Sequence, residues 1–385
     1  MSADGWKKYT LEDIAKYKTG KLNSNAAEAN GIYPFFTCSP ETLKINSFAF
    51  DCEAAILAGN NANGVFCLKY YNGKFNAYQR TYIITADPLT VNIKFIFYQL
   101  DLQLNRLQSI SHGTATKYLT IPLLNEIEVN LPSIETQTRI ASILSALDDK
   151  IELNRQTNAT LEAIAQAIFK EWFVDFHFPG ATGEMQDSEL GPIPKGWRVG
   201  KIGEICEVNK NTISKRDVFE QIEYLEISGV NRGVISKTTI YSYGAEPSRA
   251  KRKLSHGDTV LSTVRPNRGA YFLALNPSST LIASTGFAVF SPITVPSSFL
   301  YLFLTASEQL EYYGHVADGG AYPAINSNLI IDIDLVVPST DVLNDFQSIV
   351  ESLFEALDNN NSQSTIIAQT RDVLLPKLMS GEIEV

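Results

Sequence analysis

The stretch NEIEVNLPSIETQTRIASILSALDDKIELNRQTNATLEAIAQAIFKEWF (residues 125–173) decides the fold of this chain. After Pro132, Ser133 can cap a helix, and Glu135 lies in its first turn, where a carboxylate is favourable. From there apolar and amide side chains recur with the period of about 3.5 residues that is typical of a helix paired with another helix. The expected seam consists of Ile140, Leu144, Leu147, Ile151, Asn154, Leu161 and Ile168.

A second stretch near the end of the chain has the same spacing, with Ser339 or Thr340 as its cap. Because neither helix can bury its apolar stripe alone, we expect the two to pair, although a single amphipathic helix lying on its own domain stays open. Pro376 predicts a kink or fraying near the end of the second helix. The expected seam consists of Phe346, Val350, Leu353, Leu357, Asn360, Ile367 and Leu374.

Both seams are polar at their middle, with Asn154 and Asn158 in the first and Asn360 and Ser364 in the second. Polar seam positions cost stability and fix the register of a helix pair. The polar centres would meet in either direction, so the seam alone does not set the orientation. Repeat symmetry favours antiparallel helices, each of roughly 36 residues and about 54 Å at the helical rise of 1.5 Å per residue.

The chain repeats itself, since GWKKYTLEDI (5–14) resembles GWRVGKIGEI (196–205) and EIEVNLPS (126–133) resembles DIDLVVPS (332–339). The segment TLEAIAQAIF (160–169) likewise aligns with TRDVLLPKLM (370–379). The predicted order is therefore module, helix, module, helix. The expected bounds are 1–136 for the first module, 137–178 for its helix, 190–340 for the second module and 341–385 for the second helix.

Each module is expected to be mixed α and β, because short apolar runs are bounded by Gly and Asn and are followed by one helical stretch. The helical stretches are 93–104 and 299–310, and the runs before the spacers, 126–132 and 332–338, alternate as edge strands do. The predicted class is α+β: two similar mixed modules separated by a pair of long antiparallel coiled-coil helices. The expected strands include 54–59, 64–71, 80–86, 224–228, 258–264, 270–275 and 285–290.

The formal net charge of −10 excludes a generally basic protein. The acidity lies in the helical segments: residues 137–190 hold four basic and nine acidic residues, and residues 341–385 hold two and eight. The modules are nearly neutral and can still bind DNA if their cations gather on one face, whereas the acidic helices should face something other than phosphate. No run of about 18 apolar residues and no apolar signal core occur, which predicts a cytoplasmic protein that does not enter a membrane. Four scattered cysteines, Cys38, Cys52, Cys67 and Cys206, predict free thiols rather than a zinc site or disulfides.

Catalytic motifs are missing from the sequence. There is no GxxxxGK[ST], HExxH or GxSxG pattern, and the tetrad expected of a DNA methyltransferase fails because Ser278 follows Asn276 and Pro277. We therefore expect no enzyme activity, no metal and no cofactor in this chain.

Two diverged modules held by a spacer suit DNA, whose features recur at fixed distances. In the second module, SRAKRK (248–253) and RPNRG (265–269) offer donors, and in the first GNNANG (59–64) takes the place of RPNRG. A further matched pair is HGTATKY (112–118) and DGGAYPA (318–324). Arginine suits guanine, asparagine suits adenine, and Lys or Thr suits phosphate, although each loop could equally be an ordinary polar hairpin. The candidate DNA-binding residues are Asn60, Asn61, Asn63, Lys74, Arg80, Thr114, Lys117, Arg249, Lys251, Arg252, Lys253, Arg265, Asn267, Arg268 and Tyr322.

The chain resembles the specificity subunit of type I restriction–modification enzymes over essentially its whole length. Residues 125–173 look like the central conserved region of that family, LLPKLMSGEIEV (374–385) looks like its C-terminal ending, and STGFAVF (284–290) looks like a strand of its recognition domains. The chain departs from the pattern where DNNNSQS (358–364) replaces the LDDKIELN (147–154) of the first helix, which predicts looser pairing there.

The resemblance implies that each module is a target recognition domain for one half of a split, asymmetric double-stranded DNA sequence, and that the helices set the gap. It implies docking of two methyltransferase subunits that carry S-adenosylmethionine, with restriction subunits as optional partners. Two other hypotheses remain at this stage: a coiled-coil scaffold with two protein-binding modules, and a self-contained methyltransferase, which should bind cofactor alone.

Overall fold

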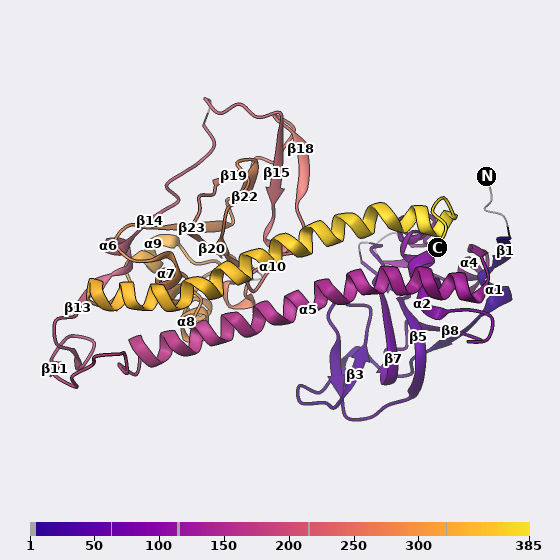
Figure 1. Cartoon of the computed structure of the whole chain (residues 1–385), viewed down its shortest axis with the longest axis horizontal. Coiled ribbons are helices and arrows are strands. Elements are labelled where there is room, and N and C mark those ends of the chain that lie inside the picture. Colours follow the sequence, from indigo (N-terminus) through magenta and orange to yellow (C-terminus); the bar gives the residue numbers. More distant parts are fainter. Residues whose placement is uncertain (1–4, 63, 114–115, 215, 321) are drawn as a thin grey trace. The chain divides into compact units, whose positions relative to one another are not determined.

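The computed structural model describes residues 5–62, 64–113, 116–214, 216–320 and 322–385 (Figure 1). The chain forms two compact units. Unit 1 comprises residues up to Glu152 together with Ser364–Val385, and unit 2 comprises Leu153–Gln363. Each unit thus contains one module and part of each long helix. Two candidates, Asn63 and Thr114, lie outside the described residues.

Unit 1 is built on a six-stranded sheet in the order β2-β8-β5-β7-β3-β4. The predicted strands 54–59 and 80–86 correspond to its centre, where Ala55, Leu57 and Ile84 are buried against helix α2 (Ile93–Asp101). The strand predicted at 64–71 begins only at Leu68 and continues to Ala77. The sheet strands are β2 (Ala15–Thr19), β3 (Tyr33–Phe36), β4 (Leu43–Ile45), β5 (Phe50–Ala58), β7 (Leu68–Ala77) and β8 (Thr81–Ala86).

Unit 2 has two four-stranded sheets, ordered β14-β23-β20-β21 and β18-β15-β22-β19. The strands of the first are β14 (Cys206–Val208), β20 (Asp258–Ser262), β21 (Tyr271–Ala274) and β23 (Phe287–Pro292). The strands of the second are β15 (Gln221–Leu225), β18 (Thr239–Ser242), β19 (Ala250–Lys253) and β22 (Leu281–Ser284). A small hairpin of β16 (Val230–Asn231) and β17 (Val234–Ile235) completes this part of the unit.

The repeated openings of the two modules have the same role. In unit 1, β1 (Lys7–Thr10) pairs with β10 (Glu128–Leu131), the strand that precedes the first long helix. In unit 2, β13 (Arg198–Lys201) pairs with β24 (Asp334–Val337), the strand that precedes the second. The alternating runs that predicted edge strands thus form two-stranded ladders beside the spacers.

Each of the predicted module helices is in fact two helices. In unit 1, α2 is followed by α3 (Leu104–Ile110), and in unit 2, α7 (Ser297–Leu304) is followed by α8 (Ser307–Val316). The continuous helices predicted over 93–104 and 299–310 are therefore wrong in detail. At the second break the Thr305 hydroxyl donates to the Tyr301 carbonyl, a local bond that competes with helix continuation.

Two long helices, α5 (Ile134–Phe173) and α10 (Thr340–Ser380), pack antiparallel. The Ser133 hydroxyl accepts a hydrogen bond from the Thr136 amide and so caps α5. Residues 174–178, which the sequence assigned to the first helix, lie beyond its end, and Phe176 has a left-handed backbone with φ 60°. The second helix continues through Pro376 to Ser380, so the fraying predicted there does not occur.

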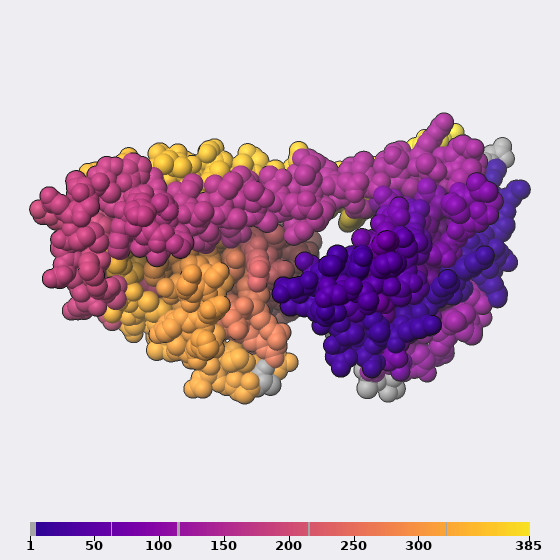
Figure 2. All heavy atoms as spheres, turned by 90° about the horizontal axis from the view of Figure 1, so that it is seen from below, coloured from indigo at the N-terminus to yellow at the C-terminus, as the bar shows by residue number. Residues whose placement is uncertain are grey.

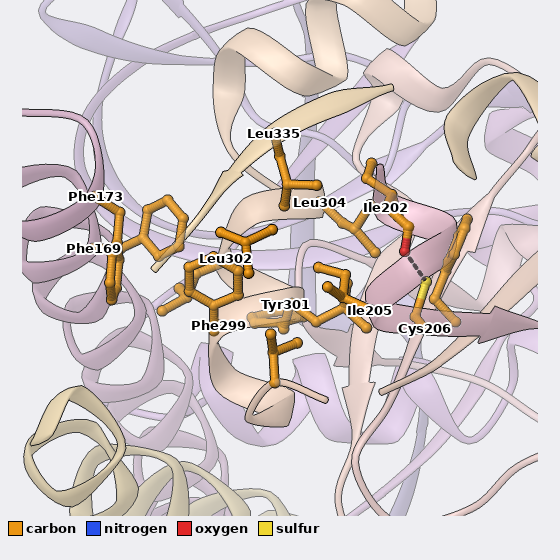
Figure 3. Packing of buried hydrophobic residues seen from close by; sticks show 14 of the residues in the cluster. Phe169, Phe173, Ile202, Ile205, Cys206, Phe299, Tyr301, Leu302, Leu304 and Leu335 are labelled. Atoms are coloured by element: carbon orange, nitrogen blue, oxygen red, sulfur yellow. Dashed lines mark hydrogen bonds between the residues drawn. The ribbon is translucent and has the colours of Figure 1, made fainter. Parts of the chain in front are cut away.

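Each unit holds one end of the helix pair in its core. In unit 1, Ile140 and Leu144 of α5 share a buried cluster with Leu378 of α10. In unit 2, Phe169 and Phe173 of α5 pack with Phe346 of α10 and face the side chains of α7 (Figure 3). All fourteen expected seam residues are buried or half-buried. Helix and module therefore share one hydrophobic core in each unit.

The middle of the pair is joined by amides. Asn154 Nδ2 donates to Gln363 Oε1 at 3.0 Å, Asn158 Nδ2 donates to Asn361 Oδ1 at 2.8 Å, and Asn360 Nδ2 donates to Asn158 Oδ1 at 2.8 Å. The segment DNNNSQS, for which the sequence predicts looser pairing, bonds across the seam through Asn360, Asn361 and Gln363.

The predicted α+β class is confirmed: two mixed modules and two long antiparallel helices. Across the described ranges, no helix combines the length and apolarity that crossing a membrane requires. The same residues contain no group of three His, Cys, Asp or Glu side chains able to hold a metal ion.

Candidate DNA interface

The two candidate loops of unit 1 pair with each other. Strand β6 (Asn60–Asn61) forms a short ladder with β9 (Lys117–Tyr118), in which Asn60 faces Tyr118 and Asn61 faces Lys117. The Leu119 amide also donates to the Gly59 carbonyl at 2.8 Å. Residues 59–61 and 117–119, far apart in sequence, thus form one surface element.

Further contacts hold this element to the rest of unit 1. The Gly59 amide donates to the Arg80 carbonyl at 2.8 Å, and Cys38 Sγ donates to Asn60 Oδ1 at 3.0 Å. The candidate Arg80 therefore adjoins the paired loops. Lys74 does not share this position: it lies in β7 opposite Asp51, at the start of β5, whereas the loops follow the end of β5. The Lys74 ammonium is 4.7 Å from the ring centroid of Phe48.

The corresponding loops of unit 2 also meet. Val264 forms an isolated β-bridge with Ala324, and the Arg265 amide donates to the Pro323 carbonyl at 2.8 Å. The Arg265 guanidinium lies 4.6 Å from the ring centroid of Tyr322, a cation–π contact. Each unit therefore brings together the two candidate loops that the sequence matched between modules.

The loop of unit 2 presents donors to solvent on a strained backbone. Arg265 has φ 47°, a left-handed conformation that non-glycine residues seldom adopt. It precedes the short helix η3 (Pro266–Arg268), on which Asn267 and Arg268 are exposed. Tyr322 is 73% exposed beside them. An exposed aromatic ring, two guanidinium groups and an amide provide hydrogen-bond donors together with a stacking surface.

A sequence model of the type I restriction modification DNA specificity domain matches residues 3–163 and residues 194–369, one match for each module and the long helix that follows it. This chain belongs to that family. Its members are the non-catalytic DNA-specificity subunits of type I restriction–modification systems, and S-adenosylmethionine is bound by the methyltransferase subunit of those systems. The predicted family and function are confirmed, and the alternatives of a protein scaffold and a self-contained methyltransferase are set aside.

Relatives of full length carry the same description. The chain is 27% identical to the type I restriction enzyme EcoDI specificity subunit of Escherichia coli, covering 98% of this chain and 88% of that protein. It is 25% identical to the HindI specificity subunit of Haemophilus influenzae, covering 98% and 99%. A crystal structure of a type I S subunit from M. genitalium has the same fold, with a TM-score of 0.56 and 19% identity over 97% of this chain and 96% of that one.

The basic run SRAKRK of this specificity subunit is largely a strand rather than a loop. Residues 250–253 form β19, paired with β22, and of the four cations of the run only Arg249 is exposed. Lys253 Nζ pairs with Asp217 at 2.7 Å, and the side-chain bond from Lys253 lowers the pKa of Asp217 to about 2. Arg252 Nε is buried without a hydrogen-bond partner among the described residues, and burial lowers the pKa of its guanidinium. With Lys251 half-buried as well, the run offers fewer cations to a ligand than its sequence suggests.

Sequence reasoning missed two residues near the loop of unit 2. Arg232, at the tip of the β16–β17 hairpin, has φ 40° and donates its amide to the Gly269 carbonyl. Glu162 of α5 accepts a hydrogen bond from the buried Tyr301 hydroxyl at 2.6 Å. The dipeptide Arg232–Gly233 is a turn signal that could have been noticed, but the position of Glu162 depends on how α5 meets the module.

Proposed function

We propose that units 1 and 2 each read one half of a split, asymmetric double-stranded DNA sequence. The observation that carries this proposal is that the same pair of loops meets in both units while the side chains on them differ. Unit 1 presents Asn60, Asn61 and Lys117, whereas unit 2 presents Arg265, Asn267 and Arg268. A common framework with different donors suits two different half-sites.

The donor types fit the chemistry of base and phosphate recognition. Arginine can donate two bonds to guanine, asparagine can pair with adenine in the same fashion, and lysine contacts phosphate. Arg268 and Asn267 are assigned to base edges, and Lys117 to phosphate. Tyr322 is assigned to stacking or to holding Arg265 in place. Asn63, Thr114, Arg80, Arg249 and Lys251 remain candidates for supporting contacts.

Exchanging modules tests this assignment. Replacing residues 1–136 with the corresponding module of another specificity subunit should change one half of the methylated sequence and leave the other half and the gap intact. Methylation mapping of the host genome reads all three features together. A change in both halves, or in neither, would refute the assignment of one half to each unit.

The long helices are proposed to set the gap between the half-sites, since each of them contributes residues to both units without interruption. Inserting four residues into α5 and four into α10 adds about 6 Å at 1.5 Å per residue. We expect both half-sites to stay the same and the gap to lengthen by one or two base pairs, because B-DNA rises about 3.4 Å per base pair. An unchanged gap would contradict this role.

Two methyltransferase subunits are proposed to dock on equivalent helix surfaces, with restriction subunits joining the cytoplasmic complex. The repeat places Ile143 of α5 and Ile349 of α10 at matching positions, and they are 38% and 44% exposed. Figure 2 shows side chains of α5, in magenta, at the surface in that view. Apolar side chains exposed on acidic helices suit a protein partner better than phosphate.

Native mass spectrometry of the assembled complex tests the docking. Ile143→Asp and Ile349→Asp should each remove one methyltransferase subunit, and the double variant should remove both. Thr160→Asp, which adds the same charge at another exposed position of α5, should keep both subunits. Full assembly of the double variant would show that partners dock elsewhere.

A further inference from the structure

A buried contact joins α5 to the module of unit 2. The Tyr301 hydroxyl donates to Glu162 Oε1 at 2.6 Å, and the Tyr301 side chain is 2% exposed. Burial raises the pKa of the Glu162 carboxyl, while the Tyr301 hydrogen bond and the charge of Arg232 lower it. Glu162 is therefore a partly buried acid whose environment includes one hydroxyl donor and one cation.

The tip of the β16–β17 hairpin lies against this carboxylate. A Cβ atom at Gly233 would be 3.3 Å from Glu162 Oε2 and 3.5 Å from the Tyr301 hydroxyl. Gly233 has φ 79°, a left-handed conformation that favours glycine, and a Cβ there would press on the Glu162 carboxylate. The residue before it, Arg232, is also left-handed, a conformation that the Cβ of any non-glycine residue disfavours and in which glycine would be free of strain.

The same hairpin supports the candidate recognition loop on its other side. The Arg232 amide donates to the Gly269 carbonyl at 2.6 Å, and the Gly233 amide donates to the Tyr271 carbonyl at 2.8 Å. Arg232 Cγ lies 2.9 Å from where a Cβ of Gly269 would be, so the arginine side chain covers that glycine. Gly269 ends η3, which carries Asn267 and Arg268.

We propose that Glu162 and Arg232 position the 265–269 loop, so that α5 fixes the direction in which unit 2 presents its base-reading side chains. The inference rests on the proposed reading of one half-site by this loop. The Arg232 side chain lies against Gly269 at the end of η3, and the next residue, Gly233, lies against the Glu162 carboxylate, so the hairpin tip links α5 to the loop. Both residues are positioning residues, since neither is assigned a contact with DNA.

The test uses the assembled complex and competing duplexes that carry single base-pair substitutions in either half-site. Glu162→Gln keeps an acceptor for Tyr301 but removes the negative charge beside the hairpin tip, and Arg232→Gly removes the side chain without strain. Each should lower discrimination in the unit 2 half-site about tenfold, which corresponds to about 1.4 kcal/mol, and leave the unit 1 half-site unchanged. The double variant should lose no more discrimination than the more affected single variant, because the two residues act together on the same loop. Arg232→Lys should restore most of the discrimination.

Two further variants separate the possible outcomes. Gln166, one turn further along α5, donates to the Leu302 carbonyl at 3.2 Å and does not act through the hairpin. Gln166→Ala should lower the melting temperature but preserve discrimination. Arg268→Ala removes an exposed donor of the loop itself and should lower discrimination in the unit 2 half-site. If Arg268→Ala does so and Glu162→Gln does not, the positioning role is refuted while half-site reading stands. If neither does, both are refuted.

Discussion

Asn154 of α5 and Asn360 of α10 lie opposite each other where the two long helices meet in unit 2. Asn154 Nδ2 donates to the Asn360 carbonyl at 3.3 Å, and Asn154 is only 2% exposed. Asn360 Nδ2 in turn donates to Asn158 Oδ1. A one-turn slip of either helix would separate these amides, so the pair specifies the register of the spacer as well as holding it.

Removing one side-chain amide from this network should lower the stability of the folded protein. Asn154→Ala leaves the Gln363 side chain without this donor and should lower the free energy of unfolding by about 1–3 kcal/mol. Thr160→Ala, at an exposed position of the same helix, should change it by less than about 0.5 kcal/mol. Urea denaturation followed by circular dichroism measures both. Equal effects would show that the amides do not contribute as a network.

Unit 1 depends on an ion pair at its own end of the helices. Arg371 Nη1 lies 2.7 Å from Asp148 Oδ1, each side chain is 31% exposed, and the Tyr98 hydroxyl donates to the same carboxylate at 2.5 Å. Arg371→Met should lower the free energy of unfolding by about 1–3 kcal/mol, because it leaves the half-buried Asp148 carboxylate without its cation. Tyr98→Phe removes the hydrogen bond to Asp148 and should lower the free energy of unfolding by about 1 kcal/mol. Hydrogen exchange of the backbone amides of β5 and β8 measures the stability of unit 1. If these amides are protected equally in the wild type and in Arg371→Met, the ion pair does not stabilise the unit.

Glu162 should make the stability of unit 2 depend on pH. Burial raises the pKa of its carboxyl above the usual 4.5, against the smaller effects of Tyr301 and Arg232, so the folded state binds the proton more tightly than the unfolded state. Relative to Glu162→Gln, the wild type should therefore gain stability as the pH falls from neutral through the raised pKa, with no further gain below the unfolded value. Melting temperatures of both proteins between about pH 4 and pH 8 give the comparison. A difference that does not vary with pH would contradict the raised pKa.

Two lysines of unit 1 should differ in their effect on DNA affinity. Lys117 lies in the paired loops, whereas Lys74 lies opposite Asp51 at the start of β5. Lys117→Ala should reduce the slope of log affinity against log salt concentration by about one, the value expected for one lost phosphate contact. Lys74→Ala removes the same charge and should leave the slope unchanged. If Lys74→Ala reduces the slope and Lys117→Ala does not, the DNA-binding surface of unit 1 lies at the other end of β5.

Features carried by periodicity and internal repetition could be predicted from the sequence. The heptad spacing located both long helices, and the alternating runs 126–132 and 332–338 located one strand of each ladder beside the spacers. Loop matching between modules also identified the segments that meet in each unit, although nothing in the sequence indicated that residues 60–61 would form a ladder with 117–118.

Features set by long-range pairing could not be predicted. The run SRAKRK suggested an open basic loop, but its pairing with β22 made it a strand, and Asp217, 36 positions earlier than Lys253, took up one of its cations. Arg232 and Glu162 could not be predicted either, because their roles depend on contacts between α5, the β16–β17 hairpin and η3, which are far apart in sequence. Of the kink or fraying predicted at Pro376, fraying does not occur, since Leu375 and Leu378 pack into the unit 1 core and the helix runs on to Ser380.

The central claim is that this chain reads a split DNA sequence with two different units at a set spacing. Mapping methylated bases across the host genome, with the chain present and with it deleted, tests that claim most directly. We predict a two-part motif with a gap of constant length that disappears completely on deletion. A methylation pattern that survives deletion, or that consists of one continuous motif, would contradict the account.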